Sequence, residues 1–405
     1  MTFVTEFNQL PLAILTRRAE RAGEGDMERA LAVLHGNVLE RFAALLSPAA
    51  GQPQFLEAMA REAHRLTTLH FGRTIRLFAP LYLSNECINT CKYCGFSRDN
   101  PILRVTLTPE QVLAETRYLL AEGFRNILLV SGEHPRFASN DYMRQCVALL
   151  HREGVPSINL EVGPMETPDY EKIVAAGAEG LVVYQETYNR EVYREMHTAG
   201  PKKDFDWRLE TPERGYAAGF KRLGIGALLG LWHWREEAIA LAAHVEYLLR
   251  HCWKAQITVS LPRLRPAAGE FEPKYPMSNR DLTQLVCALR LTFPQVGIVL
   301  STRESAKLRD GLVPLGVTMM SAGSHTEPGG YTGAGSDKLH ITRKGMKFEA
   351  PVIRSEGEHA TEQFHIADER PPAVVAARLK ELGYEAVWKD WDATLSGGNG
   401  VNVER

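Results

Sequence analysis

NILLVSG (126–132), PSINLEVG (156–163) and GLVVYQE (180–186) are three short apolar runs that follow one another at similar intervals. Each run has the length of a buried strand and is bounded by Gly, Pro or polar residues. Their apolar residues are nearly continuous rather than alternating, which is typical of parallel strands covered on both faces. The pattern therefore predicts a parallel sheet with covering segments between its strands.

The same pattern extends in both directions along the chain. Further runs of this kind are IRLFAPLYL (75–83), the core of 224–231, AQITVSL (255–261), GIVLST (297–302) and GVTMMSAG (316–323). Amphipathic segments such as 108–124, 140–154 and 235–252 separate the runs and are typical of helices. Eight strands alternating with helices predict an α/β fold, a (βα)8 TIM-type barrel over residues 71–325. An open doubly wound sheet is the alternative, and the even spacing of the repeat favours the barrel.

The two flanks of the barrel differ from it. Residues 1–70 contain amphipathic stretches and predict an N-terminal helical extension. Residues 326–405 form a C-terminal extension, in which the polar, Gly-rich stretch 332–362 predicts a flexible insertion. The following segment, PPAVVAARLKELGYEAVWKDW (371–391), predicts one more helix and strand that pack on the barrel.

The composition is that of an ordinary globular protein. The 405 residues include 47 Lys and Arg against 49 Asp and Glu, 44% are hydrophobic and 24% are charged. With no basic surplus, general nucleic-acid binding is not expected. The longest apolar runs are too short to span a bilayer, and MTFVTEFNQL at the start is unlike a signal peptide. We therefore expect a cytoplasmic protein that binds neither nucleic acid nor membrane.

Three of the six cysteines lie close together in CINTCKYC (87–94), directly after the first predicted strand. Cys87, Cys91 and Cys94 predict a soft-metal site, because clustered thiols in a reducing compartment bind such metals. Zinc would need a fourth ligand, and none stands nearby in the sequence. An iron–sulfur cluster held by three cysteines would leave one iron open to a small molecule. The alternative is a zinc site whose fourth ligand is a His distant in the sequence. The remaining cysteines, Cys146, Cys252 and Cys287, are expected in the core.

A CxxxCxYC motif after the first strand of a barrel resembles the radical S-adenosylmethionine superfamily. The resemblance implies a 4Fe–4S cluster whose open iron is chelated by the methionine moiety of S-adenosylmethionine. It also implies reductive cleavage of the sulfonium to a 5′-deoxyadenosyl radical, so that the cofactor carries the difficult chemistry. Ser131, Gly132 and Glu133 match the position of the Gly-Gly-Glu motif that holds the methionyl ammonium in this superfamily.

A wider resemblance, from about residue 80 to residue 392, is to the 2-iminoacetate synthase family. The strings that carry it include PLYLSNECINTCKYCGFS (80–97), LLVSGEHP (128–135), KKDFDWRLETPER (202–214), VSLPRLRP (259–266), LSTRES (300–305) and EPGGYTG (327–333). This family implies cleavage of the Cα–Cβ bond of L-tyrosine to 2-iminoacetate (dehydroglycine) and p-cresol, with release of methionine and 5′-deoxyadenosine. It places the reaction in thiamine-thiazole synthesis, with thiazole synthase and a reducing electron donor as partners.

The candidate site residues fall at the carboxyl ends of predicted strands, where barrel active sites lie. The resemblance to amino-acid lyases assigns the substrate carboxylate to Arg303, for which an ion pair with Glu304 or a surface role is the alternative. It places Tyr82 and Ser321 near the substrate's amino group. Candidate contacts of S-adenosylmethionine are Ser131, Gly132, Glu133, Glu161, Glu186 and Arg208, of which Glu186 could meet either ligand.

Two other functions remain open on the sequence. The first is the same radical chemistry on tryptophan or another aromatic amino acid, because spacing alone does not fix the size of the ring. The second is a non-enzymatic zinc-binding scaffold in which the three clustered cysteines are purely structural. A related hydrogenase-maturation lyase carries a second, C-terminal cysteine-bound cluster, whereas the last cysteine here is Cys287.

Overall fold

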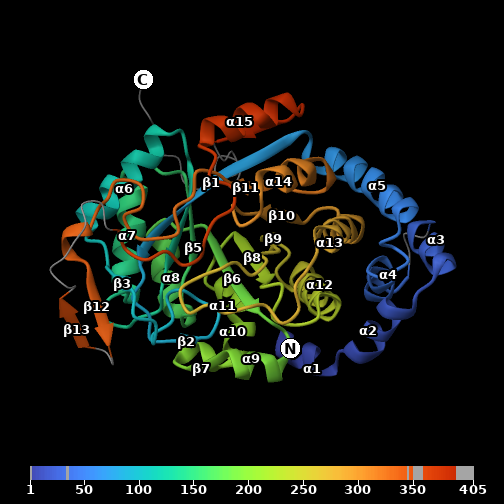
Figure 1. Cartoon of the computed structure of the whole chain (residues 1–405), viewed down its shortest axis with the longest axis horizontal. Coiled ribbons are helices and arrows are strands. Elements are labelled where there is room, and N and C mark those ends of the chain that lie inside the picture. The colour runs from blue at the N-terminus through green and yellow to red at the C-terminus, as the bar shows by residue number, and fades with distance from the viewer. Residues whose placement is uncertain (1, 33–35, 344–345, 350–358, 389–405) are drawn as a thin grey trace.

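Eight parallel strands close into a barrel in the computed structural model, which describes residues 2–32, 36–343, 346–349 and 359–388 (Figure 1). The barrel strands, in spatial order, are β1 (Thr74–Ser84), β4 (Asn126–Ser131), β5 (Ser157–Glu161), β6 (Gly180–Glu186), β8 (Arg222–Ala227), β9 (Gln256–Ser260), β10 (Gly297–Leu300) and β11 (Met319–Ser321). β11 pairs with β1 from Met319 to Ser321, and this pairing closes the sheet. The predicted barrel is confirmed, and the open sheet is wrong.

Helices cover the barrel as expected from the amphipathic segments. They are α6 (Pro109–Ala121), α7 (Asn140–Arg152), α8 (Thr167–Ala175), α11 (Thr211–Ala217), α12 (Trp234–His251), α13 (Asn279–Thr292) and α14 (Ala306–Leu312). α6 shows why such segments begin where they do: Thr108 caps it in a capping box with Gln111, and Pro109 occupies its first turn. Cys146, Cys252 and Cys287 are buried, as expected for small apolar side chains.

Five helices precede the barrel and pack along one side of it (Figure 1). They are α1 (Phe3–Gln9), α2 (Leu12–Arg21), α3 (Glu24–Ala32), α4 (Val38–Leu45) and α5 (Pro53–Phe71). Specific polar contacts join them to the barrel helices: Gln284 of α13 donates to the carbonyls of Leu45 and Ser47, and Arg41 donates to that of Leu291. The predicted N-terminal helical extension is therefore confirmed.

The chain after the barrel returns to it twice. α15 (Pro372–Glu381) is followed by β14 (Glu385–Val387), which pairs in parallel with the first residues of β1. The predicted helix–strand extension is confirmed, and residues 389–391 of that prediction lie outside the described residues. Within the stretch 332–362, β12 (His340–Arg343) and β13 (Met346–Glu349) form an antiparallel hairpin that pairs with β3 (Leu103–Arg104). Residues 344–345 and 350–358 lie outside the description, and the flexibility of the insertion stays a prediction.

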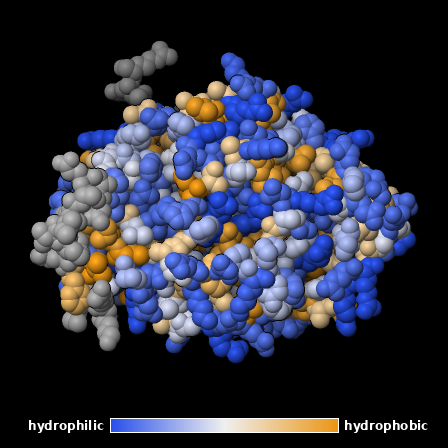
Figure 2. Space-filling model, in the orientation of Figure 1, coloured by the Kyte–Doolittle hydropathy of each residue, from blue (hydrophilic) through white to orange (hydrophobic). Residues whose placement is uncertain are grey.

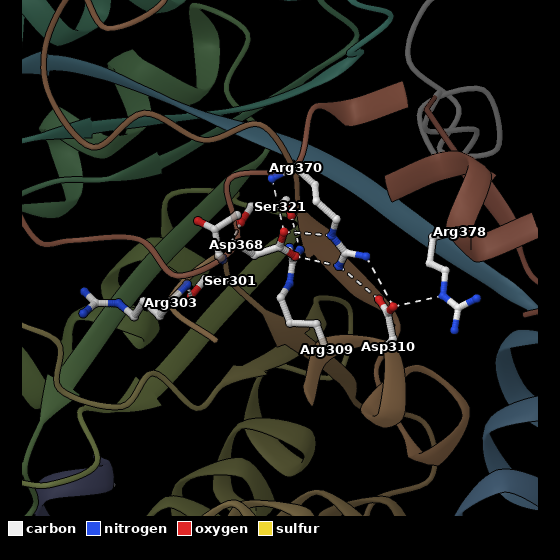
Figure 3. A network of polar contacts seen from close by, with 9 residues as sticks. Ser301, Arg303, Arg309, Asp310, Ser321, Asp368, Arg370 and Arg378 are labelled. Carbon is white, nitrogen blue, oxygen red and sulfur yellow. Dashed lines mark hydrogen bonds and ion pairs between the residues drawn. The ribbon is translucent and has the colours of Figure 1, made fainter. Parts of the chain in front are cut away.

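Residues 359–370, which we call the strap, cross the carboxyl end of the barrel. The strap is held by backbone hydrogen bonds from Thr361 to the Leu103 carbonyl, from His365 to Pro266, and from Ala367 and Asp368 to Thr302. Its end is fixed by a buried ion pair between Asp368 and Arg309 of α14 (Figure 3). Arg370 pairs with both Asp368 and Asp310, and Arg378 of α15 extends the network to Asp310.

Polar side chains cover most of the face shown in Figure 2, with apolar groups scattered among them. No helix in the described ranges is long and apolar enough to cross a membrane.

We predict that Asp368→Asn lowers the free energy of unfolding by about 3 kcal/mol, because it leaves the charge of buried Arg309 without its anionic partner. Denaturant titration of the purified protein measures this. The matched control is Glu57→Gln, which removes an exposed ion pair with Arg61 and should change stability by less than about 0.5 kcal/mol. Equal effects of the two substitutions would contradict the prediction.

Candidate active site

A cavity lies at the carboxyl ends of the barrel strands, under the strap. Tyr82, Glu161, Arg303 and Ser321, which the sequence analysis assigned to substrate or cofactor, all line this cavity. Its apolar lining includes Phe78, Leu128, Val130, Val299 and Phe364. Strands far apart in the chain thus bring a cation, hydroxyl groups and an apolar wall into one space.

Arg303 follows β10 and forms no salt bridge with a carboxylate of the described residues. Its guanidinium lies 3.3 Å from the ring centroid of Phe364, and Figure 3 shows it pointing away from the Arg309–Asp368–Arg370 group. The alternative of an ion pair with Glu304 is wrong, because Glu304 pairs with Arg263. Arg303 is therefore free to receive an anionic group in the cavity.

Tyr82 and Ser321 are two of the hydroxyl-bearing residues that line this cavity with Arg303. The Tyr82 hydroxyl donates to Gln363 Oε1 at 2.8 Å. Ser321 Oγ accepts from the backbone N–H of Thr302 at 3.1 Å, while the Ser321 carbonyl accepts from Arg309. Burial raises the pKa of Tyr82 well above its usual value, and the nearby charge of Glu161 adds to this effect. Tyr82 is therefore a neutral phenol at physiological pH.

Glu161 ends β5 and faces the same space. Burial raises the pKa of Glu161 to about 7, with a further contribution from the negative charge of Glu186, while Arg303 opposes both. A carboxyl group with this pKa changes its protonation state near neutral pH.

Cys87, Cys91 and Cys94 lie on the loop after β1, which one buried arginine organises. Arg104 donates to four carbonyls of this loop: those of Asn85, Phe96, Ser97 and Asn100. Cys91 lies in β2 (Thr90–Cys91), a short strand that pairs with β7 (His197–Ala199). The loop therefore presents its thiols from a fixed backbone.

The three thiols carry raised pKa values, mainly because they are buried; the charges of the other thiols raise the pKa of Cys91 further, and Lys202 opposes this. In the described part of the chain, no three His, Cys, Asp or Glu side chains gather around one ion position. Cys thiolates are the usual ligands of iron–sulfur clusters, and the positive irons of such a cluster would stabilise the thiolates. The donor set therefore fits an iron–sulfur cluster.

The segment Ser131-Gly132-Glu133 lies directly against the cysteine loop. A Cβ atom on Gly132 would lie 2.3 Å from the Glu86 carbonyl oxygen, so only glycine allows this approach. Glu133 accepts from Asn89 Nδ2 at 2.7 Å, and its carbonyl accepts from the N–H of Ile88. The two motifs that the sequence analysis combined are therefore neighbours in space.

Glu186 and Arg208 meet beside Cys91 together with Lys202, which the sequence analysis did not single out. Lys202 Nζ lies 2.6 Å from Glu186 Oε1, and Arg208 Nη2 lies 3.6 Å from the same oxygen. Glu186 has a φ of 71°, a left-handed conformation that is rare for a residue other than glycine. Burial would raise the pKa of Glu186, but the charges of Lys202 and Arg208 bring it below its usual value.

Comparison with known proteins adds independent findings. The model of the "Radical SAM superfamily" matches residues 81–242, and that of the "Biotin and Thiamin Synthesis associated domain" matches residues 260–385. The 2-iminoacetate synthase of Escherichia coli (strain K12) is 40% identical over 397 residues, which cover 97% of this chain and 98% of the relative. The 2-iminoacetate synthase of Salmonella typhimurium (strain LT2) is 39% identical with the same coverage.

The chain belongs to the 2-iminoacetate synthase family. It is accordingly a carbon–carbon lyase of the radical S-adenosylmethionine superfamily, as the sequence predicted. Among solved structures, a HydG maturase of the [FeFe]-hydrogenase has a TM-score of 0.83 at 29% identity, covering 95% of this chain and 81% of its own. Methylornithine synthase (PylB) has a TM-score of 0.66 at 20% identity, covers 89% of this chain and 97% of its own, and shares the fold.

The contacts reveal four functional candidates that sequence reasoning missed: Asn89, Arg104, Lys202 and Gln363. Asn89 lies within the cysteine motif and Lys202 within another string that carried the family resemblance, so membership of these strings was a usable signal. Arg104 and Gln363 act on the cysteine loop from outside those strings, and only the folded chain brings them there.

We predict that Glu161→Gln changes how the stability of the metal-free protein depends on pH. Because the folded-state pKa is raised from 4.5 to about 7, protonated Glu161 contributes stability that is fully present below pH 4.5 and is lost as the pH rises through 7. The melting temperature of the wild type should therefore fall relative to Glu161→Gln between pH 4.5 and about 7, the interval that the two pKa values define. Glu57→Gln serves as the surface control, and parallel pH profiles for wild type and Glu161→Gln would contradict the assignment.

Proposed function

We propose that this protein cleaves the Cα–Cβ bond of L-tyrosine to give 2-iminoacetate and p-cresol, as a radical S-adenosylmethionine lyase of thiamine-thiazole synthesis. The observation that carries the proposal is Arg303, a half-buried arginine that lines the cavity and has no carboxylate partner among the described residues. An α-amino acid supplies the carboxylate that such a group requires.

In this proposal Cys87, Cys91 and Cys94 hold a 4Fe–4S cluster whose remaining iron is open to S-adenosylmethionine. When bound, the two supply a 5′-deoxyadenosyl radical that abstracts hydrogen from the substrate. The backbone beside Gly132 receives the methionyl ammonium, with Ser131 and Glu133 next to it. Glu161, Glu186 and Arg208 would contact the remainder of S-adenosylmethionine. Support comes from the close packing of Gly132 on the cysteine loop and from the family to which the chain belongs.

The remaining residues position the amino acid. Arg303 would bind its carboxylate, and Tyr82 and Ser321 would hydrogen-bond its amino group. The apolar wall formed by Phe78, Leu128, Val130 and Val299 would receive the aromatic ring. The strap covers this space and limits access of water, which matters because dehydroglycine hydrolyses.

Two partners belong to the same proposal. A reducing electron donor must supply the cluster, and thiazole synthase would take up the unstable product. The family resemblance and the match to the "Biotin and Thiamin Synthesis associated domain" support thiazole synthase as a partner.

We expect cluster-loaded protein, incubated without oxygen with reductant, S-adenosylmethionine and L-tyrosine, to form equal amounts of 5′-deoxyadenosine and p-cresol. Chromatography measures both products. Turnover of tryptophan but not of tyrosine would replace the substrate in the proposal. Absence of both products from protein with full iron and sulfide content, on either amino acid, would overturn the proposal.

We expect Arg303→Lys to lower kcat/KM for L-tyrosine at least about 100-fold, because an ammonium cannot reproduce the planar two-point contact with a carboxylate. The loss should fall mainly on KM while the iron content stays that of the wild type. Arg61→Ala, an exposed arginine on α5, is the control. A kcat/KM for Arg303→Lys within the error of this control would remove Arg303 from the site.

A further inference from the structure

Gln363, in the middle of the strap, uses both ends of its side chain. Its Oε1 accepts from the Tyr82 hydroxyl at 2.8 Å, and its Nε2 lies 3.9 Å from Cys94 Sγ, in position to donate to the sulfur. Tyr82 lines the cavity, whereas Cys94 belongs to the cysteine loop. One amide thus joins the substrate side of the site to the cofactor side.

The backbone around Gln363 holds this side chain in place. Its N–H donates to the Thr326 carbonyl at 2.8 Å, and its carbonyl accepts from the N–H of Gly95 at 3.1 Å. A Cβ atom on Gly95 would lie 2.6 Å from the Gln363 carbonyl oxygen. The strap therefore packs so closely on the cysteine loop that only glycine fits at this position. The backbone on both sides of Gln363 is thus held in place, and it directs the side chain to Tyr82 and Cys94.

The contact with Tyr82 has a directional consequence. A phenol has one hydroxyl proton, and Tyr82 donates it in the hydrogen bond to Gln363 Oε1. The hydroxyl oxygen then offers only lone pairs to the cavity, and it can accept a hydrogen bond but not donate one. An amino group, which carries N–H donors, is the substrate group that this oxygen suits.

The contact with Cys94 acts on the cofactor side. A hydrogen bond from an amide to a ligand sulfur stabilises negative charge on that sulfur and is one of the factors that set the reduction potential of an iron–sulfur cluster. The second contact of Gln363 therefore has a measurable effect that is independent of catalysis.

We propose that Gln363 is a positioning residue of the active site. It orients the Tyr82 hydroxyl as an acceptor for the substrate's amino group and donates a hydrogen bond to Cys94, so that the strap sets both amine recognition and the potential of the cluster. This inference rests on the proposed function for the identity of the substrate, and its effect on Cys94 does not.

The experiment compares cluster-loaded Gln363→Leu and Gln363→Glu with His365→Gln, a control on the same strap whose side chain is exposed. Gln363→Leu removes both contacts and should lower kcat/KM for L-tyrosine roughly tenfold, through KM, as expected for one lost hydrogen bond in a buried site. Binding of 3-(4-hydroxyphenyl)propionate, which lacks the amino group, should not change. The midpoint potential of the cluster should become more negative in Gln363→Leu.

Gln363→Glu separates the two roles, because it keeps an acceptor for Tyr82 and loses the donor to Cys94. Its potential should shift in the same direction, while its affinity for tyrosine exceeds that of Gln363→Leu. The double variant Gln363→Leu with Tyr82→Phe should bind tyrosine no worse than the poorer single variant, since each single substitution already removes the hydrogen bond between the two side chains.

Potentials equal to that of His365→Gln in both variants, or equal losses of affinity for tyrosine and for the desamino analogue, would overturn the inference. If Gln363→Leu does not fold, the potential and the tyrosine KM of Gln363→Glu decide the question. Failure of the wild type to form p-cresol would refute the proposed function alone, because the potentials still test the contact with Cys94.

Discussion

The ion pair between Arg309 and Asp368 joins α14 to the end of the strap, and both side chains are inaccessible to solvent. A buried charge must be paired, so neither residue can leave this contact without a large cost in free energy. Burial would raise the pKa of Asp368, but hydrogen bonds from Arg370 and the charge of Arg309 bring it below its usual value. Arg309 also donates to the carbonyl of Ser321, at the end of the last barrel strand. One guanidinium therefore fixes the closure of the barrel, the position of a site residue and the cover of the cavity together.

The same device, a buried arginine that gathers carbonyl oxygens, recurs elsewhere in the chain. Arg104 holds the cysteine loop, and Arg290 donates to the carbonyls of Pro294, Val296 and Gly316 beneath the last two strands. Each converts an irregular segment, whose carbonyls would otherwise lack partners, into a rigid part of the structure. Arg104 in this way fixes the loop that carries the three cysteines, and a fixed backbone is a condition for a preorganised site.

The barrel could be predicted because each strand carries its own local signal, and the site could be located because barrel strands deliver their carboxyl ends to one face. The partners of individual side chains could not be predicted. Glu304, next to Arg303 in the sequence, pairs with Arg263, which lies 41 positions away. Gln363 reaches Tyr82 across 281 positions of sequence. The contact of Gln363 depends on the path of the C-terminal extension, for which periodicity and composition carry no information.

The distribution of charge around the cysteines explains why Lys202 belongs to the site. Lys202 and Arg208 lie side by side, and their positive charges oppose each other while burial disfavours both. Glu186 compensates part of this charge, at the cost of a left-handed backbone that places its carboxylate between them. The charge of Lys202 also lowers the pKa of each of the three clustered thiols. The negative charge of Glu186 raises the pKa of both Lys202 and Arg208, so both side chains stay charged. Three thiolates that held a cluster would add negative charge at this position, and the two cations would compensate part of it. The arrangement of Lys202, Arg208 and Glu186 therefore fits thiolates as neighbours.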